Sequence, residues 1–423
     1  MLMKPVFSDL GAKLGGPCGI QELMDDLGQA LSTHPNMRML GGGNPAAIPE
    51  MQALWRDQWR ALVDEEPDRL DRALVNYDPP AGNTRFREVM AAFLQRECGW
   101  SCEAKNIAVL PGGQAAFFYL QMLLVGGSGG RQMLYPIAPD YIGYANQGLH
   151  AESLASVPGQ IEQRGAHRFK YHIDFERLRA RLSPQTAGLC LSCPTNPTGN
   201  VVSAEELDQL RELAREQRVP LILDQAYGMP FPGAIYVDWK PVWDEGIIAS
   251  ISLSKLGLPG LRTSVIVADE SVVTALANMN SVVALANGNI GQALLQPLLE
   301  DATLTRCARE VIRPFYQRRR DFAEAVLSEA LGDAVPYALH ESQGAFFLWL
   351  WLRDCPVTSA ELYRRLKERE VLVVPGHYFF FGLEEAWQHQ HECLRITYSQ
   401  PEAVVREGLQ ILAEEVRKAY AEG

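Results

Sequence analysis

The chain has 423 residues, of which 47% are hydrophobic and 21% are charged, and its net charge is −12 at pH 7. This length exceeds what one hydrophobic core usually supports, so we expect two domains in one compact body. The acidic balance argues against a non-specific nucleic-acid binder, no apolar run could span a membrane, and the first residues lack a signal-peptide core. We therefore expect a cytoplasmic protein that binds neither nucleic acid nor a membrane.

Between about residues 105 and 270, short β-rich runs alternate with helical patterns. The clearest helix is expected at 203–217, where Ser203 and Glu206 form a capping box. Near-continuous apolar strands between helices indicate a mainly parallel sheet covered on both faces. The expected strands lie at 106–111, 131–136, 187–192, 220–224, 247–254 and 263–268, and a second clear helix lies at 114–124.

The C-terminal part has a different pattern, which predicts a smaller α/β domain. A long helix is expected between about 301 and 330, with Pro314 as a candidate kink. Strands are then expected at 344–352, 371–375 and 394–398, and helices at 358–370 and 401–420. Because chain termini often lie close together, we assign residues 1–47 and 301–423 to the smaller domain and residues 48–300 to the larger one.

Cysteine and histidine do not predict a metal site. Cys190 and Cys193 form a C-x-x-C pair, but a structural zinc site needs a second pair at a fixed spacing, and the sequence has none. The pair lies in an apolar run that we interpret as a buried strand. His377, His389 and His391 are near one another in sequence, and we interpret them as loop or interface histidines.

The segment 252–262, SLSKLGLPGLR, places Lys255 directly after an apolar strand. A lysine is seldom buried without a task, and one whose pKa is lowered by burial can act as a nucleophile or form a Schiff base. Ser252 can donate to a phosphate, and the guanidinium of Arg262 can bind a phosphate dianion. A surface lysine in a Gly/Pro loop is the alternative interpretation of this segment alone.

Two further segments place polar residues at the same edge of the predicted sheet. Asn196 lies in the loop PTNPTGN, which two prolines restrain, and Asp224 ends the expected strand PLILD. Asn196, Asp224 and Lys255 are separated by intervals of about 30 residues, which is about one βαβ unit each. All three are therefore expected at the carboxyl edge of the sheet, where open α/β folds bind ligands.

Pyridoxal 5′-phosphate (PLP) accounts for these residues together. Asp224 would pair with the pyridine N–H and keep the ring able to accept electrons. Tyr227 and Asn196 would hydrogen-bond the ring oxygen, and Tyr141 would cover one face of the ring. The groups expected to hold the phosphate are Ser252, Arg262 and the backbone amides of Gly113 and Gln114 at a helix N-terminus.

From about residue 38 to residue 398 the chain resembles the class I/II aminotransferases of PLP fold type I. The motifs that carry the resemblance are GGGNP (41–45), NYDPPAG (76–82), PTNPTG (194–199), D-x-A-Y (224–227), S-x-S-K (252–255) and LRITY (394–398). The resemblance implies that residues 48–300 form the PLP-binding domain, with PLP on Lys255. It implies that Arg395 binds the substrate α-carboxylate, assisted by the Gly43 backbone and Asn196. It also implies a homodimer in which Tyr77 reaches the phosphate of the neighbouring subunit.

Further segments, APDYIGYA (138–145), FKYHIDFE (169–176), AYGMPFPG (226–233) and VPGHYFF (374–380), resemble one branch of this family. That branch transfers the amino group between L-valine and pyruvate, which implies small amino acids and 2-oxo acids as partners and 3-methyl-2-oxobutanoate and L-alanine as products. The alternatives on the same fold are an aminotransferase of different specificity, a carbon–sulfur β-lyase or a cyclopropane-forming synthase. A transcription regulator would need a basic helix-turn-helix segment, and none precedes residue 38. A chain that keeps the fold without catalysis is disfavoured by Lys255.

Overall fold

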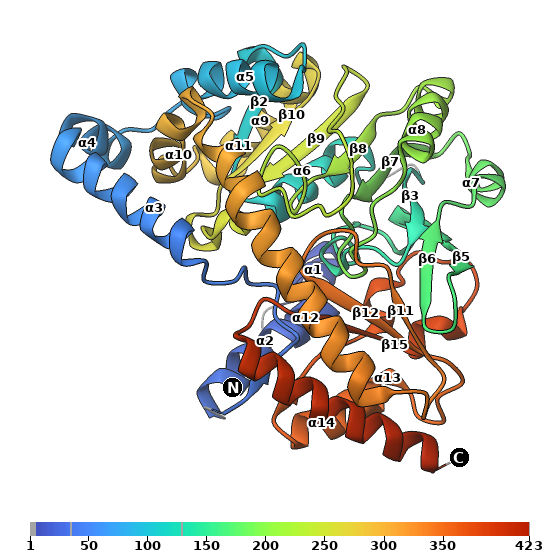
Figure 1. The fold of residues 1–423 in the computed structure, drawn as a ribbon. Coiled ribbons are helices and arrows are strands. Elements are labelled where there is room, and N and C mark those ends of the chain that lie inside the picture. The colour runs from blue at the N-terminus through green and yellow to red at the C-terminus, as the bar shows by residue number, and fades with distance from the viewer. Residues whose placement is uncertain (1–5, 34–35, 128–129, 423) are drawn as a thin grey trace, which may run out of the picture.

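The computed structural model describes residues 6–33, 36–127 and 130–422. Its strands form one sheet of seven strands, one sheet of six and a two-stranded pair. The seven-stranded sheet lies in the upper half of Figure 1 and the six-stranded sheet in the lower half, with α12 running from one to the other. Among the described residues, no helix is long and apolar enough to cross a membrane.

The seven-stranded sheet is mainly parallel, as predicted. Its order is β2-β10-β9-β8-β7-β3-β4, and only β10 runs antiparallel to its two neighbours. The six strands expected between residues 105 and 270 all belong to this sheet, and β4 is an addition that the sequence did not reveal. The strands are β2 (Ile107–Leu110), β3 (Gln132–Ala138), β4 (Leu154–Pro158), β7 (Thr186–Ser192), β8 (Leu221–Asp224), β9 (Ile247–Ser252) and β10 (Ser264–Val267).

Alternate residues of these strands pack into separate clusters on the two faces of the sheet, because successive side chains of a strand point to opposite faces. In β8, Ile222 packs with residues of α6 (Gly113–Leu124) and α9 (Glu270–Ala284). Its neighbours Leu221 and Leu223 belong to the other cluster, which includes residues of α5 (Thr84–Cys98) and α8 (Ala204–Gln217). Burial on both faces explains why the strands are apolar throughout.

The six-stranded sheet has the order β14-β15-β12-β11-β6-β5. Two of its strands, β5 and β6, come from residues 160–172, which lie inside the range 48–300 that the sequence assigned to the larger domain. They belong to this sheet because β6 pairs in parallel with β11. The division into two domains stays a prediction. The strands are β5 (Gln160–Gln163), β6 (Arg168–His172), β11 (Tyr337–His340), β12 (Phe347–Leu352), β14 (Val374–Pro375) and β15 (Cys393–Thr397); β1 (Arg38–Met39) and β13 (Val371–Leu372) form a separate parallel pair.

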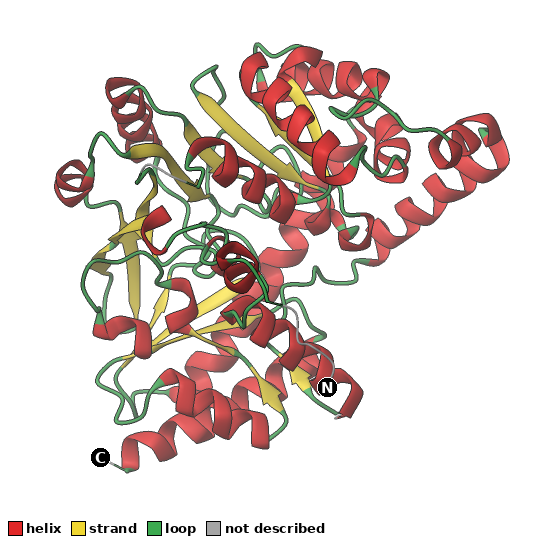
Figure 2. Ribbon diagram, turned by 180° about the vertical axis from the view of Figure 1, so that it is seen from behind, coloured by secondary structure: helices red, strands yellow, loops and turns green. Residues whose placement is uncertain are grey.

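The remaining helices lie around the two sheets, and α3 and α4 extend away from the rest of the chain in both views (Figures 1 and 2). The long helix expected at about 301–330 is interrupted by a π-helical segment, Ala308–Ile312. Pro314 is the second residue of α12 and directly follows this π-helical segment, which is where an irregularity of the helix accommodates a proline. These helices are α1 (Asp9–Leu14), α2 (Gly19–Thr33), α3 (Pro49–Arg60), α4 (Pro67–Val75), α7 (Phe175–Arg181), α10 (Ile290–Glu300), α11 (Thr303–Cys307), α12 (Arg313–Leu331), α13 (Ser359–Glu368) and α14 (Glu402–Ala421).

Candidate active site

The carboxyl ends of β7, β8 and β9 bring the predicted residues to one edge of the larger sheet. The last residue of β7, Ser192, pairs with Asp224 of β8, and Asp224 pairs with Ser250 of β9. Asn196 and Lys255 follow within a few residues of these positions, so the expected phase of the three segments is confirmed. Asp224 is the last residue of β8, and Asn196 and Lys255 lie in the segments that follow β7 and β9.

Lys255 is only partly exposed, and its amine donates a 2.7 Å hydrogen bond to the carbonyl of Gly43. Its Nζ lies 5.2 Å from the ring centroid of Tyr227 and 5.7 Å from that of Phe346. Burial, together with the positive charge of Arg395, lowers the pKa of Lys255 to about 8, while Asp224 opposes the shift. About a tenth of this amine is therefore unprotonated at pH 7 and about half at pH 8, which suits a nucleophile or a base.

Asp224 is buried and held in one orientation by two donors. The hydroxyl of Tyr144 donates to Oδ2 at 2.6 Å, and the backbone N–H of Ala226 donates to Oδ1 at 3.0 Å. Burial raises the pKa of Asp224, and the hydrogen bonds from Tyr144 and Ala226 oppose that shift. The sequence analysis did not identify Tyr144, although it lies three residues after Tyr141 in the same segment. Its ring packs edge-on against Tyr141, with centroids 5.1 Å apart.

The N-terminus of α6 and the guanidinium of Arg262 lie against each other. Gly112, the residue before α6, has φ +90°, and a Cβ added there would lie 2.2 Å from Nη2 of Arg262. Only glycine therefore lets the guanidinium approach the first backbone N–H groups of the helix, which have no intrahelical acceptor. Gln114, in the first turn, donates from its side chain to the carbonyl of Gly143 at 2.8 Å and accepts from the Tyr141 hydroxyl at 3.3 Å.

Arg395 is a buried cation with neutral partners. It lies on β15 and is 3% exposed. Its Nη1 donates to Oδ1 of Asn196 at 2.8 Å and its Nη2 to the carbonyl of Gly41 at 2.6 Å, and its guanidinium carbon lies 4.4 Å from the ring centroid of Phe347. Among the described residues no carboxylate pairs with it, and burial lowers its pKa to about 10. A buried guanidinium without a counter-charge is suited to bind an anion.

A cavity of about 190 Å³ opens beside Lys255. Of the residues that line it, Lys255 alone is charged, and the walls include the buried side chains of Ile48, Met51, Trp55 and Tyr316. Trp55 is fixed by a 2.9 Å hydrogen bond from its indole N–H to the carbonyl of Leu256. The Tyr316 hydroxyl accepts from the backbone N–H of Ala46 at 2.8 Å. This space suits an apolar group.

Most of the predicted site residues thus lie together, with Tyr77 as the exception. Tyr77 follows α4 and is 82% exposed, and no contact among the described residues joins it to the others. The aromatic residues Phe346 and Phe347 were missed because the run GAFFLWLWL was interpreted only as a core strand. The predicted residues that the structure places at the site are Gly43, Gly113, Gln114, Tyr141, Asn196, Asp224, Tyr227, Ser252, Lys255, Arg262 and Arg395.

The cysteine pair lies beside Asp224, because the backbone N–H of Cys193 donates to the Asp224 carbonyl at 2.9 Å, and the three histidines lie in the short helical segments 376–379 and 388–391. Cys190 is in β7, and both it and Cys193 are buried and free of disulfides. His389 is buried and contacts the Tyr171 hydroxyl, while the rings of His377 and His391 lie 6.2 Å apart. In the part of the chain that the structure describes, no three His, Cys, Asp or Glu side chains are grouped so that they could hold a metal ion.

The groups at the edge of the sheet fit PLP. The buried carboxylate of Asp224 suits a protonated ring nitrogen, the amine of Lys255 suits the aldehyde, and Arg262 with the N-terminus of α6 suits the phosphate. Ser252 adds a buried hydroxyl, which accepts from the backbone N–H of Ser254 at 3.2 Å. Fold and site together define a PLP-dependent enzyme of fold type I.

Comparison with known proteins gives the family. The family model "Aminotransferase class I and II" matches residues 50–412. The valine–pyruvate aminotransferase of Escherichia coli (strain K12) is 44% identical over 98% of this chain and 99% of its own length. The crystal structure of valine–pyruvate aminotransferase from Salmonella typhimurium LT2 superposes with a TM-score of 0.88 at 43% identity, covering 96% of this chain and 100% of that one. The chain belongs to the class I and II aminotransferases, and it is a PLP-dependent transferase.

Proposed function

We propose that this protein transfers the amino group between L-valine and pyruvate, giving 3-methyl-2-oxobutanoate and L-alanine. The observation that carries the proposal is the buried guanidinium of Arg395. It has no carboxylate partner among the described residues, and its positive charge lowers the pKa of Lys255. Every amino acid and 2-oxo acid supplies the missing carboxylate. The apolar cavity beside Lys255 supports an aliphatic side chain, and the 44% identity to the E. coli valine–pyruvate enzyme supports the particular pair.

The proposed chemistry divides between the cofactor and Lys255. PLP, when bound, accepts electron density from the substrate α-carbon and carries the amino group between the two half-reactions. Lys255 attaches the cofactor and, once substrate has displaced it, moves the proton at the α-carbon. Its lowered pKa of about 8 keeps part of the amine unprotonated near neutral pH, which this base needs.

Asp224 stabilises the protonated ring nitrogen in this proposal. A buried carboxylate is costly unless a cation or donors accompany it, and Tyr144 and Ala226 supply two donors in the protein itself. Asp224 would take the protonated ring nitrogen of bound PLP as its remaining partner. Tyr227 and Asn196 would hydrogen-bond the ring oxygen of bound PLP, and Tyr141 would pack against the ring. The phosphate is held by Ser252, Arg262 and the amides of Gly113 and Gln114.

Arg395 binds the α-carboxylate through two parallel hydrogen bonds. Asn196 and the Gly41 carbonyl hold two of its nitrogen atoms, at 2.8 and 2.6 Å, so the plane of the guanidinium is set before substrate arrives. The backbone at Gly43 borders the same site, where its carbonyl accepts from Lys255. With the carboxylate placed, the substrate α-carbon lies near Lys255 and the side chain can enter the apolar cavity.

We also propose a homodimer with shared active sites. Tyr77, Leu74 and Val75 lie at and after the end of α4 and are 82%, 63% and 75% exposed. Apolar side chains that cluster on a surface favour coverage by a partner. Tyr77 would reach the phosphate held by the neighbouring subunit. The cytoplasmic location expected from the sequence stays a prediction.

The test is a reaction of the purified holoenzyme with L-valine and pyruvate. We expect 3-methyl-2-oxobutanoate and L-alanine in equal amounts, and at most one equivalent of 3-methyl-2-oxobutanoate per active site, without L-alanine, when pyruvate is omitted. A preference for aspartate or an aromatic donor over valine and alanine would overturn the substrate assignment and leave the aminotransferase assignment intact. A carbon–sulfur β-lyase would instead release pyruvate and ammonia from a cysteine-type substrate without any amino acceptor.

A further inference from the structure

Lys170 is a buried lysine that the proposed chemistry does not use. It lies on β6 and is 4% exposed. Its ammonium donates to Oδ1 of Asn200 at 2.7 Å, to the carbonyl of Val201 at 2.9 Å and to Oε1 of Gln343 at 2.6 Å. These three acceptors match the three donors of an ammonium group, and all of them are uncharged.

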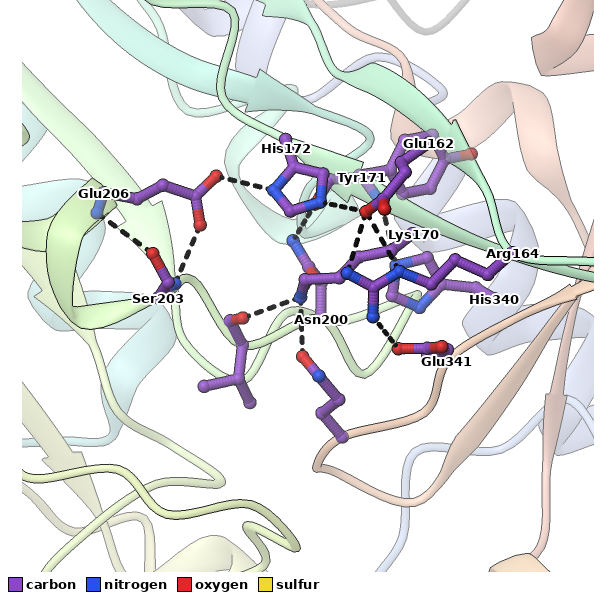
Figure 3. Close-up of polar contacts among 12 residues, drawn as sticks. Glu162, Arg164, Lys170, Tyr171, His172, Asn200, Ser203, Glu206, His340 and Glu341 are labelled. Carbon is purple, nitrogen blue, oxygen red and sulfur yellow. Dashed lines mark hydrogen bonds and ion pairs between the residues drawn. The ribbon is translucent and has the colours of Figure 1, made fainter.

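The nearby carboxylates are engaged by other groups (Figure 3). Glu206 accepts from the backbone N–H of Ser203 at 2.8 Å and contacts His172 at 3.2 Å. Glu341 pairs with Arg164 at 2.7 Å. Lys170 is therefore held by directed hydrogen bonds, and its burial lowers its pKa to about 8. Burying a cation among neutral partners costs stability, and the three hydrogen bonds offset part of that cost while fixing the groups that accept them.

The first two acceptors lie at the end of the loop that carries Asn196. Asn200 closes this loop, because its carbonyl accepts from the backbone N–H of Thr195 at 2.8 Å. The Asn200 side chain also donates to the carbonyl of Tyr171, the residue after Lys170, at 3.2 Å. The loop is thus attached to β6 at two neighbouring residues.

The third acceptor ties the same loop to the segment between β11 and β12. The backbone N–H of Gln343 donates to the carbonyl of Gly199 at 3.0 Å. Gly199 has φ +70°, and a Cβ there would lie 2.6 Å from the carbonyl oxygen of Gly344, so the two segments are in close contact. Lys170 therefore joins the loop after β7 of one sheet to two segments of the other.

We propose that Lys170 is a positioning residue for carboxylate recognition. By fixing Asn200, Val201 and Gln343 it holds the 195–200 loop so that Asn196 faces Nη1 of Arg395, at 2.8 Å. The loss of the ammonium releases the loop, and the guanidinium of Arg395 loses one of the two contacts that set its plane. This inference rests on the proposed function in one respect, the use of an α-carboxylate by every substrate.

The test separates carboxylate binding from the rest of the site. Two fragments of valine are titrated into the holoenzyme and followed by the cofactor spectrum: 3-methylbutanoate, which lacks the amino group, and isobutylamine, which lacks the carboxylate. In Lys170→Met we expect the Kd of 3-methylbutanoate to rise about tenfold, the scale of one displaced hydrogen bond to a charged group, and the Kd of isobutylamine to change less than about twofold. KM for valine and pyruvate should rise more than kcat falls.

Lys105→Met is the matched control, because Lys105 is exposed and its ion pairs with Glu103 and Glu270 are long, at 3.6 and 3.8 Å. Equal weakening of both fragments in Lys170→Met, or unchanged binding of 3-methylbutanoate, overturns the inference. If Lys170→Met does not fold, Gln343→Leu decides, since it removes one acceptor from a half-buried position and should weaken 3-methylbutanoate selectively. If Lys170→Met shows this selective weakening but the wild-type enzyme does not use valine, the proposed substrate is overturned and the role of Lys170 stands.

Discussion

Replacing Arg395 with lysine should weaken all substrates by a similar factor. The guanidinium uses Nη1 on Asn196 and Nη2 on the Gly41 carbonyl, and it keeps a fork of N–H groups for a carboxylate. A lysine ammonium is a point charge that cannot satisfy both acceptors and also present two parallel donors. Loss of one to two hydrogen bonds to charged groups costs about 2–4 kcal/mol, which is roughly a 30- to 1,000-fold loss in kcat/KM.

The assay is steady-state kinetics with valine, alanine, pyruvate and 3-methyl-2-oxobutanoate, each varied in turn. Arg369→Lys is the control, because Arg369 pairs with Glu414 at 2.6 Å and Glu415 at 3.3 Å. The control should lose some stability and keep its kcat/KM values. If Arg395→Lys lowers Tm and leaves kcat/KM unchanged, Arg395 is a structural residue. A loss confined to one substrate would show that it reads the side chain.

Three other changes test the remaining roles. In the cofactor-free protein, Lys255 should react with trinitrobenzenesulfonate with a half-maximal rate near pH 8, because its lowered pKa makes the neutral amine available there. A midpoint above pH 10 would show that burial does not lower the pKa of this amine. Asp224→Ala should lower kcat by about a hundredfold or more and change KM far less, and near-normal turnover would mean that another group keeps the ring protonated. Mixing inactive Lys255→Ala with a badly impaired Tyr77→Ala should restore part of the activity through composite sites, and a fully active monomer would refute the shared site.

The sequence predicted the sheet edge well because the edge follows from topology. Parallel strands joined by helices place their carboxyl ends together, so polar residues at strand ends such as Asn196, Asp224 and Lys255 meet whatever the loop details are. Arg395 comes from the other sheet, and no periodicity could place it at this edge. Its position was available only through the family motif LRITY.

Other features could not be predicted, because they depend on which side chain faces inward. The segment APDYIGYA holds two tyrosines three residues apart, and the sequence does not say that Tyr144 donates to Asp224 while Tyr141 donates to Gln114. Residues 160–172 contribute to the second sheet through β6–β11 pairing, and such long-range pairing leaves no local pattern. The proposed role of Tyr77 depends on a second subunit, so no local pattern of the sequence encodes it.

The most direct measurement is a half-reaction with L-valine alone. Added to purified holoenzyme without any oxo acid, valine should abolish the visible absorbance of the bound cofactor and release one equivalent of 3-methyl-2-oxobutanoate. Pyruvate should then restore the absorbance and release one equivalent of L-alanine, and Lys255→Ala should show neither change. An unchanged spectrum with valine, or ammonia release without restoration by pyruvate, would contradict transamination between valine and pyruvate.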